Sequence, residues 1–254
     1  MINVKNLTKI YGQGIPAIQD ISLTINEGEF IILFGPSGVG KSTLLRCLNY
    51  LVKPTSGEVI VDSKNLGNLS RAELLRVRQS IGMIFQEYNL VNRISVLTNV
   101  LCGGLGKVGF IRALTYSFSR EEHEAAIKAL KRAGLDDENL YLRRADTLSG
   151  GQRQRVGIAR MLVQKPKIIL ADEPIASLDI KMQHIIMDVI ADIAAKDQIT
   201  VVMSLHNIEI AKQYGSRIVG LSQGRITFDG PPKSLTTDVI NKVFDLTIKS
   251  HNDG

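Results

Sequence analysis

Apolar and polar positions alternate in short runs near the N-terminus and predict strands that are joined by turns. Residues 1–34 contain the runs INVKNL, AIQDISLTI and EFIILF, which glycine and proline interrupt. The last run is nearly continuous in apolar residues, as is typical of a strand buried on both faces of a parallel sheet. This part of the chain therefore predicts a small β region that leads into a buried strand.

The pattern then changes between helical and strand periodicity. Leucines recur at helical spacing over 41–51, a strand is predicted at 58–62, and residues 71–86 read as a helix that runs into a strand. Beyond the middle of the chain we expect strands at 167–172, 199–205, 217–222 and 225–230, with helices at 181–196 and 208–215. Alternation of strands with helices predicts an α/β fold with a mainly parallel sheet.

The middle of the chain, about 88–160, has a helical character and interrupts this alternation. Its clearest amphipathic stretch is 121–135, where Gly134 is the expected stop. The glycine-rich segment 103–120 predicts a loop with one or two helical turns. We interpret the whole stretch as a helical insertion into the α/β fold.

Composition limits the cellular compartments and the classes of protein that the sequence allows. The chain has 254 residues, 44% of them hydrophobic, but no window approaches the ~18 consecutive apolar residues of a membrane-spanning helix. The N-terminus lacks the apolar core of a secretion signal. We interpret Cys47 and Cys102 as buried thiols in a reducing compartment, so we expect a cytosolic chain unless a partner recruits it elsewhere. The four histidines are too widely spaced for a zinc site.

The net charge of +6 admits a nucleic-acid partner. The basic residues are spread along the chain without a long Lys/Arg run, however, and this pattern favours a solvated basic surface over a nucleic-acid site. We therefore expect no nucleic-acid partner.

One glycine-rich loop predicts a phosphate site. GPSGVGKS at 35–42 matches G-x-x-x-x-G-K-[ST] in full, after a predicted buried strand and before a predicted helix. Its glycines let backbone N–H groups surround a phosphate, while Lys41 neutralises β- and γ-oxygens and Ser42 offers its hydroxyl to Mg²⁺. The expected nucleotide contacts are Gly35, Pro36, Ser37, Gly38, Val39, Gly40, Lys41, Ser42 and Thr43. A chance match is the alternative, and the flanking strand and helix speak against it.

An acidic pair ends the strand predicted at 167–172. Asp172 follows four apolar residues, and we expect it to hold Mg²⁺ directly or through water. Glu173 is the candidate base that polarises the attacking water. The alternative is a strand-end pair that caps a helix.

A second glycine turn, in TLSGGQRQ at 147–154, opens another predicted helix but has no lysine. It can contact a phosphate from the open side through the Ser149 hydroxyl and the N–H groups of Gly150 and Gly151. Two chains arranged head to tail about a two-fold axis could each lend this turn to the other's ATP.

The segment LSGGQ resembles the signature of ATP-binding cassette (ABC) ATPases. The chain is similar to that family over about residues 1–235, with six motifs in the family's order. These motifs are GPSGVGKS, Gln86 after a strand, LSGGQ, ILADEP, SLD at 177–179 and His206 after a strand.

The resemblance implies roles for further residues. Tyr11 matches the aromatic residue that stacks on adenine, although a plain strand aromatic is the alternative. Gln86 matches the glutamine that reaches Mg²⁺ and the attacking water. Asp179 belongs to the loop that communicates across the dimer interface, and His206 matches the histidine that holds the γ-phosphate and orients Glu173. The resemblance thus implies a metal site at Ser42, Gln86 and Asp172, and a second phosphate contact at Ser149, Gly150, Gly151 and Gln152.

Within the family, the chain resembles the phosphonate importer branch most. The stretches that carry this resemblance are 82–106, ADEPIASLD at 171–179, SLHN around His206, FIRALTYSFSREE and SRIVGLSQGRITFDGPP. The implied function is ATP hydrolysis, with Mg²⁺, that powers uptake of a phosphonate, phosphite or phosphate. The implied partners are a second copy of the chain, two permease subunits and an extracytoplasmic solute-binding protein, at the cytoplasmic face of the inner membrane.

The implied architecture is a P-loop (RecA-like) α/β core with an N-terminal antiparallel β subdomain and an inserted helical subdomain. We expect one domain over 1–245, with β contributions from about 1–30 and 57–80, helices over about 88–160, and a flexible tail at 246–254.

Three alternatives remain open from the sequence. One is a mechanical cassette ATPase of the lipoprotein-release or cell-division type, which moves no solute. Another is an importer ATPase for a different small solute. The third is a soluble ATP-dependent switch that acts on nucleic acid, and the scattered basic residues speak against it. We expect the permease to contact residues from Glu87 to about Gly104, where the apolar Leu90, Val91, Ile94, Val96 and Leu97 divide between core and interface.

Overall fold

The computed structural model describes residues 2–12, 14–107, 112 and 117–245. The chain folds into two compact units, and each is described by itself. Met1–Gly67 and Ser204–Gly254 form one unit, and Asn68–Met203 forms the other. The second unit is therefore an insertion in the sequence of the first.

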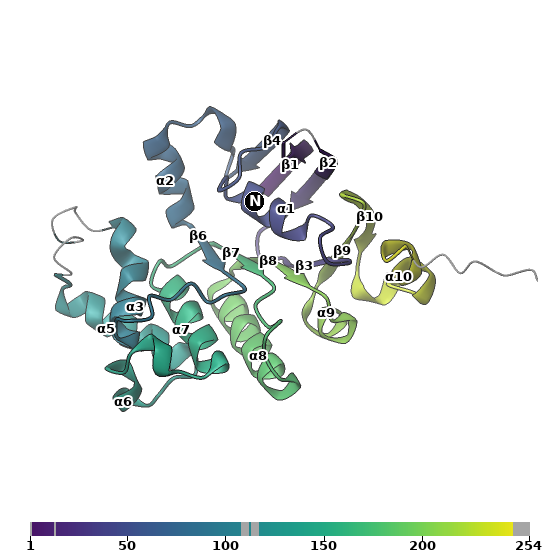
Figure 1. Cartoon of the computed structure of the whole chain (residues 1–254). Coiled ribbons are helices and arrows are strands. Elements are labelled where there is room, and N and C mark those ends of the chain that lie inside the picture. Colours follow the sequence, from purple (N-terminus) through teal and green to yellow (C-terminus); the bar gives the residue numbers. More distant parts are fainter. Residues whose placement is uncertain (1, 13, 108–111, 113–116, 246–254) are drawn as a thin grey trace, which may run out of the picture. The chain divides into compact units, whose positions relative to one another are not determined.

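The first unit contains an antiparallel sheet with the order β2-β1-β4-β5 (Figure 1). Its strands are β1 (Ile2–Ile10), β2 (Pro16–Ile25), β4 (Ser56–Val61) and β5 (Lys64–Asn65). β2 agrees with the run predicted at 17–25 to within one residue, whereas β1 extends three residues beyond the run predicted at 2–7. They continue through register shifts near Asn6 and Asp20, whose backbones take positive φ and whose side chains hydrogen bond at 2.8 Å. The antiparallel β part is thus confirmed.

A second set of strands in this unit has the order β10-β9-β3. Its strands are β3 (Phe30–Phe34), β9 (Arg217–Ser222) and β10 (Arg225–Gly230), and its helices are α1 (Lys41–Leu48), α9 (Ile208–Tyr214) and α10 (Thr237–Val243). β3 pairs in parallel with β9, and four of its five side chains are fully buried. The Phe34 ring meets the Phe244 ring edge-on at 5.2 Å, at the end of α10. The continuous apolar run therefore forms the buried strand that it predicted.

The second unit holds β8 (Thr200–Leu205, of which 200–203 lie in this unit), β7 (Ile168–Asp172) and β6 (Ile81–Ile84), in the order β8-β7-β6. β6 and β7 are parallel. α2 (Arg71–Gln79) precedes β6 and begins with a capping box in which Ser70 and Glu73 satisfy each other's backbone N–H groups. α8 (Ile180–Asp197) follows β7. The strand–helix order thus agrees with the sequence pattern.

Helices dominate the rest of this unit. They are α3 (Val96–Leu101), α5 (Arg120–Arg132), α6 (Glu138–Tyr141) and α7 (Gly150–Leu162), of which α3, α5 and α7 contact one another (Figure 1). Short 3₁₀ helices occur in this unit at η2 (Cys102–Lys107) and η3 (Ala145–Thr147), in the first unit at η4 (Pro232–Ser234), and at η1 (Leu66–Asn68), where the sequence passes from the first unit to the second. α5 ends at Arg132, two residues before Gly134, which takes φ 75° and terminates the helix as predicted. The helical subdomain is thus present.

Some predictions on individual residues are tested by the described part of the chain. Cys47 is buried, and burial raises the pKa of its thiol to about 11, but Cys102 is only half-buried, so that part of the prediction was wrong. Val96 is buried in the core and Val91 is 53% exposed, so the apolar residues after Gln86 do divide between core and surface. Within the described residues, no helix has the length and hydrophobicity that crossing a membrane requires. The tail 246–254 lies outside the described residues, as do residues 108–111 and 113–116 of the loop predicted at 103–120.

Candidate nucleotide site

The phosphate loop lies between β3 and α1, as the motif requires. Gly35, Gly38 and Gly40 all have positive φ, at 149°, 77° and 105°. A Cβ atom on Gly40 would lie 2.2 Å from the carbonyl oxygen of Ala17, and one on Gly35 would lie 2.3 Å from that of Leu221. Only glycine fits at positions 35 and 40, because the chain there has a positive φ and passes close to other backbone atoms.

Lys41 is fixed inside the loop rather than extended into solvent. Its side chain is 3% exposed, and its ammonium donates hydrogen bonds of 2.8 Å to the carbonyl oxygens of Gly35 and Pro36. A buried cation that is held by the loop's own carbonyls places a positive charge where an anion must enter. The N-terminus of α1, which begins at Lys41, adds backbone N–H groups and the positive end of its dipole.

Two further predicted contacts belong to the same unit. Tyr11 follows β1 and is 52% exposed, and the Lys9 ammonium lies 5.0 Å from the centre of its ring. An exposed ring with one face over a cation leaves the other face for stacking. His206 follows β8 and is exposed, two residues before the start of α9, whose N-cap is Asn207. Both residues thus stand at the ends of strands, as the sequence predicts.

The acidic pair lies in the second unit, at the end of β7. Asp172 is 3% exposed, and Glu173 is half-buried. Glu173 takes a φ of 47°, a left-handed conformation that costs a non-glycine residue about 1 kcal/mol or more. Such strain is concentrated at functional sites, where the surrounding structure fixes a side-chain direction. The conformation agrees with a catalytic role for this carboxylate.

The signature turn opens α7, as predicted from its two glycines. Ser149 caps the helix: its hydroxyl accepts the Gln152 N–H at 3.3 Å, and its own N–H donates to Gln152 Oε1 at 3.0 Å. The hydroxyl hydrogen of Ser149 can still be donated to a ligand. The N–H groups of Gly150 and Gly151 lie in the first turn, where a helix supplies them no internal partner. Gln152 thus supports the turn through its oxygen, a role that the S-x-x-Q spacing could have revealed.

The signature turn contacts the segment that contains Asp179. Asp179 is exposed and caps α8 by accepting the Met182 N–H at 3.0 Å. A Cβ atom on Gly151 would come within 2.7 Å of the Met182 side chain, and one on Gly150 would meet Leu178 at 3.5 Å. The two predicted dimer-facing segments are therefore neighbours within one unit.

Gln86 is connected to the signature turn through the residues that follow it, which contact α7. Gln86 is exposed, two residues beyond the end of β6. The hydroxyl oxygen of Tyr88 would lie 3.0 Å from a Cβ atom on Gly150. Arg160 of α7 donates to the carbonyl oxygens of Asn89 and Tyr88 at 2.5 and 3.0 Å. The sequence pattern did not single out Tyr88 or Arg160, and only their positions relative to α7 identify them.

The structure thus brings together Gln86, the signature turn, the acidic pair's strand and Asp179 in one unit, while Tyr11, the phosphate loop and His206 belong to the other. The donor chemistry of Ser42, Gln86 and Asp172 fits Mg²⁺, because hydroxyl, amide and carboxylate oxygens are the hard ligands that this ion prefers. These three residues are its candidate ligands.

Comparison with known proteins identifies the family. The model of the ABC transporter family matches residues 18–176. The chain belongs to the ABC transporter family. Among solved structures, this ABC chain is similar to the dimeric ATP-binding cassette MJ0796 bound to ADP and Pi, at 37% identity and a TM-score of 0.79, covering 91% of this chain and 99% of that one. It is also similar to cbiO1 from Clostridium perfringens, part of the ABC transporter complex cbiONQ, at 32% identity and a TM-score of 0.79, covering 97% of this chain and 95% of that chain.

Curated relatives match this ABC chain over nearly its whole length. The phosphonates import ATP-binding protein PhnC 3 of Halalkalibacterium halodurans is 44% identical over 98% of this chain and 96% of the relative. The PhnC protein of Alcaligenes faecalis is 44% identical over 96% of this chain and 88% of the relative. The chain is therefore an ABC ATPase with the α/β cassette fold that its motifs predict.

Proposed function

We propose that this ABC ATPase hydrolyses Mg-ATP to power the uptake of a phosphonate or a related phosphorus oxyanion. The observation that carries this proposal is the similarity to phosphonates import ATP-binding proteins of several bacteria, at 43–45% identity over almost the whole chain. A complete set of nucleotide motifs in the described residues supports the ATPase part, because no acidic or phosphate-binding position is replaced.

The chemistry follows from the residues at each position. The phosphate loop and Lys41 bind and neutralise the β- and γ-phosphates, and Tyr11 stacks on the adenine. Ser42, Gln86 and Asp172 would hold Mg²⁺, which would neutralise charge on the phosphate oxygens when it is bound. The Glu173 carboxylate orients and polarises the attacking water, and His206 donates to the γ-phosphate.

Two copies of the chain complete each site in this proposal. The exposed Ser149 and the N-terminus of α7 carry donors for an anion but have no lysine, so they suit a phosphate that another surface already holds. A head-to-tail dimer gives each ATP the phosphate loop of one chain and the signature turn of its partner. The dimeric state of the MJ0796 cassette supports this arrangement.

The proposed partners are two permease subunits in the membrane and a solute-binding protein on its extracytoplasmic side. Binding to the permease would hold this chain at the cytoplasmic face of the inner membrane. Closure of the dimer on ATP and opening after hydrolysis would drive alternating access in the permease. Residues Glu87 to about Gly104 are the proposed permease contact. The domain division over 1–245, with its tail at 246–254, is part of the same proposal.

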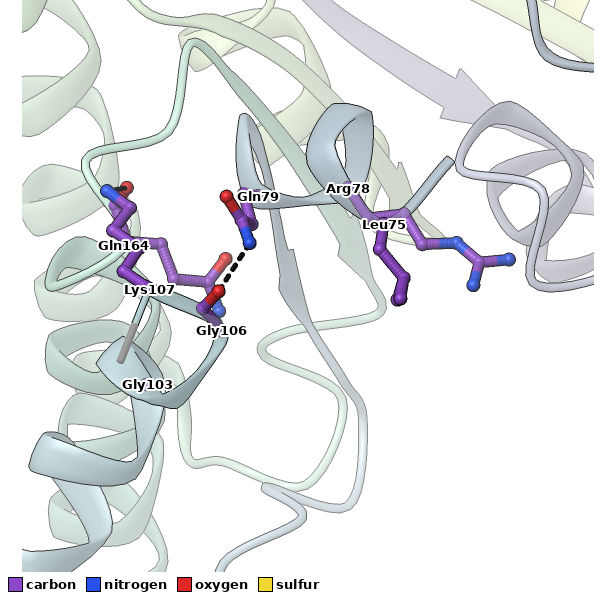
Figure 2. A pocket seen from close by; sticks show the side chains of 7 residues that line it. All are labelled: Leu75, Arg78, Gln79, Gly103, Gly106, Lys107 and Gln164. Atoms are coloured by element: carbon purple, nitrogen blue, oxygen red, sulfur yellow. Dashed lines mark hydrogen bonds between the residues drawn. The ribbon is translucent and has the colours of Figure 1, made fainter. Parts of the chain in front are cut away.

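A pocket beside that stretch is the proposed binding site for a segment of the permease. It measures about 250 Å³ and is lined by Leu75, Arg78, Gln79, Gly103, Gly106, Lys107 and Gln164 (Figure 2). Gln79 and Gly106 bridge it by a hydrogen bond of 2.5 Å, and Lys107 donates to the Gln164 carbonyl oxygen at 2.6 Å. Leu75 lines the pocket and is half exposed, and Arg78 and Lys107 add positive charge. A half-exposed leucine beside two cations suits a short cytoplasmic helix that carries an apolar and an acidic residue.

The Leu75→Glu substitution tests this proposed permease site. It places a carboxylate in the lining of the pocket and should reduce co-purification of the permease by at least about tenfold, since a charge at an apolar contact costs more than 1.4 kcal/mol. Leu51→Glu is the matched control, because both leucines are 50% exposed and Leu51 belongs to the other unit. ATP turnover of the purified chain should stay within about twofold in both variants. Equal permease recovery from the two variants would contradict the assignment.

The function itself is tested by isolating the tagged chain from its native membranes in mild detergent and identifying the co-purifying proteins by mass spectrometry. We expect a multispanning permease together with an extracytoplasmic binding protein that binds methylphosphonate, phosphite or phosphate in a titration. A permease with a large extracytoplasmic domain and no binding protein would instead favour a mechanical cassette ATPase and contradict phosphonate uptake. A binding protein that takes none of these oxyanions would point to another solute.

A further inference from the structure

The turn after Gln86 has a conformation that its sequence does not favour. Tyr88 and Asn89 take φ values of 55° and 48°, so two consecutive non-glycine residues are left-handed. Asparagine tolerates this conformation, but for Tyr88 it costs about 1–2 kcal/mol unless neighbouring groups stabilise it. The Asn89 N–H donates to the Glu87 carbonyl oxygen within the turn. Other contacts must supply the remaining stabilisation.

One face of α7 supplies those contacts. Gly150, Arg153, Gly157 and Arg160 follow each other at intervals of three or four residues, so they share one side of the helix. The Arg153 guanidinium lies 5.5 Å from the centre of the Tyr88 ring. A Cβ atom on Gly157 would lie 3.7 Å from the Tyr88 carbonyl oxygen, an ordinary van der Waals contact, so the turn packs closely against this face of the helix.

Arg160 makes the strongest contacts on this face. Its two terminal nitrogens donate to the Asn89 and Tyr88 carbonyl oxygens, at 2.5 and 3.0 Å. A planar guanidinium can hold two neighbouring carbonyls in a fixed relation, which a lysine ammonium cannot do with the same geometry. The ring of Tyr88 reaches along the helix to Gly150 at the same time. The segment 87–89 is thus in contact with α7 at two places, at Gly150 in the first turn of the helix and at Arg160 near its end.

We propose that Arg160 is a positioning residue for ATP hydrolysis: it holds the strained turn 87–89 on α7 and thereby fixes the place of Gln86 relative to the signature turn. This inference rests on the proposed function, because it gives Gln86 its role at the nucleotide. In a head-to-tail dimer, Gln86 serves the chain's own ATP, whereas the signature turn serves the partner's. The contact between Arg160 and the turn therefore links the two nucleotide sites through one rigid helix.

The Arg160→Lys variant tests this link, because it keeps the positive charge and removes the planar guanidinium that binds two carbonyl oxygens. We expect the kcat for ATP hydrolysis to fall about tenfold, because the loss of a positioning contact acts on the transition state. Binding of a fluorescent ATP analogue to the isolated chain should change by less than about twofold, since the phosphate loop carries that affinity. Arg155→Lys is the matched control, because Arg155 lies on the same helix and donates to a carbonyl oxygen, that of Gly134, at 2.7 Å. Its kcat should stay within about twofold of the wild type.

A double-mutant cycle with Gln86→Ala separates positioning from a general structural role. If Arg160 acts through Gln86, the double variant has the same kcat as Gln86→Ala alone, within about twofold. If Arg160 only stabilises the fold, the two losses multiply and the double variant falls about tenfold below Gln86→Ala, which would overturn the proposal. Thermal unfolding of each variant confirms that folded protein is compared. Failure of the ATPase proposal would be visible separately, as absence of ATP turnover in the wild-type chain.

Discussion

The Glu173→Gln variant is expected to bind ATP as tightly as the wild type and to hydrolyse it about 10²–10⁴-fold more slowly. The amide keeps the size and shape of the side chain but cannot accept a proton from the attacking water. Glu173 is half-buried at the end of a fully buried strand, in a left-handed conformation that commits its side-chain direction. Phosphate release measures the loss of turnover, and size-exclusion chromatography with ATP should show more dimer, because the bound nucleotide persists.

Glu138→Gln provides the control for this substitution. Glu138 lies in the same unit, but its side chain is 75% exposed and its contact is a 3.7 Å ion pair with Lys131. An exposed pair of this kind contributes little, so turnover should stay within about twofold of the wild type. Full turnover by Glu173→Gln would remove this carboxylate from the mechanism and leave the base unidentified.

The Gly40→Ala variant is expected to lose ATP binding and much of its stability together. The added methyl group would lie 2.2 Å from the Ala17 carbonyl oxygen, at a φ of 105° that an alanine rarely adopts. The loop must therefore move away from β2, and Lys41, the next residue, moves with it. We expect the free energy of unfolding to fall by roughly 3 kcal/mol. We expect the ATP affinity to fall by at least about tenfold.

Gly28→Ala separates the backbone strain from the steric clash. Gly28 also has a positive φ, 76°, but a Cβ atom there meets nothing within 4 Å. This variant should lose about 1 kcal/mol of stability and bind ATP normally. Equilibrium denaturation and nucleotide titration measure both quantities. If Gly40→Ala bound ATP like the wild type, the close approach of the phosphate loop to β2 would have no part in forming the site.

Much of the fold could be predicted because its signals are local. The continuous apolar run before the phosphate loop forms the buried β3, and the S-x-x-E spacing before α2 and α5 forms capping boxes at both helix starts. The full length of β1 could not be predicted. This strand continues through a register shift near Asn6, whose side chain hydrogen bonds to Asp20 across the sheet, and such a contact has no signature within either strand.

In the candidate site, too, the features with local sequence signals could be predicted and those that depend on distant contacts could not. The phosphate loop, the acidic pair and the signature turn carry their chemistry in contiguous residues, so their sequences alone predict where each stands relative to its strand or helix. The left-handed turn at Tyr88 and Asn89 has no glycine to reveal it, and its support by Arg160 joins residues more than seventy positions apart. A contact of this kind follows from tertiary packing, which no periodicity along the chain encodes.

Uptake by reconstituted vesicles tests the central claim most directly. The co-purified permease and binding protein, together with this chain and internal Mg-ATP, should accumulate radiolabelled methylphosphonate. Accumulation should stop when Glu173→Gln replaces the wild type, and excess unlabelled phosphite or phosphate should reveal which oxyanion competes best. ATP hydrolysis without accumulation of methylphosphonate, phosphite or phosphate would contradict the proposal that this ATPase powers phosphorus oxyanion import.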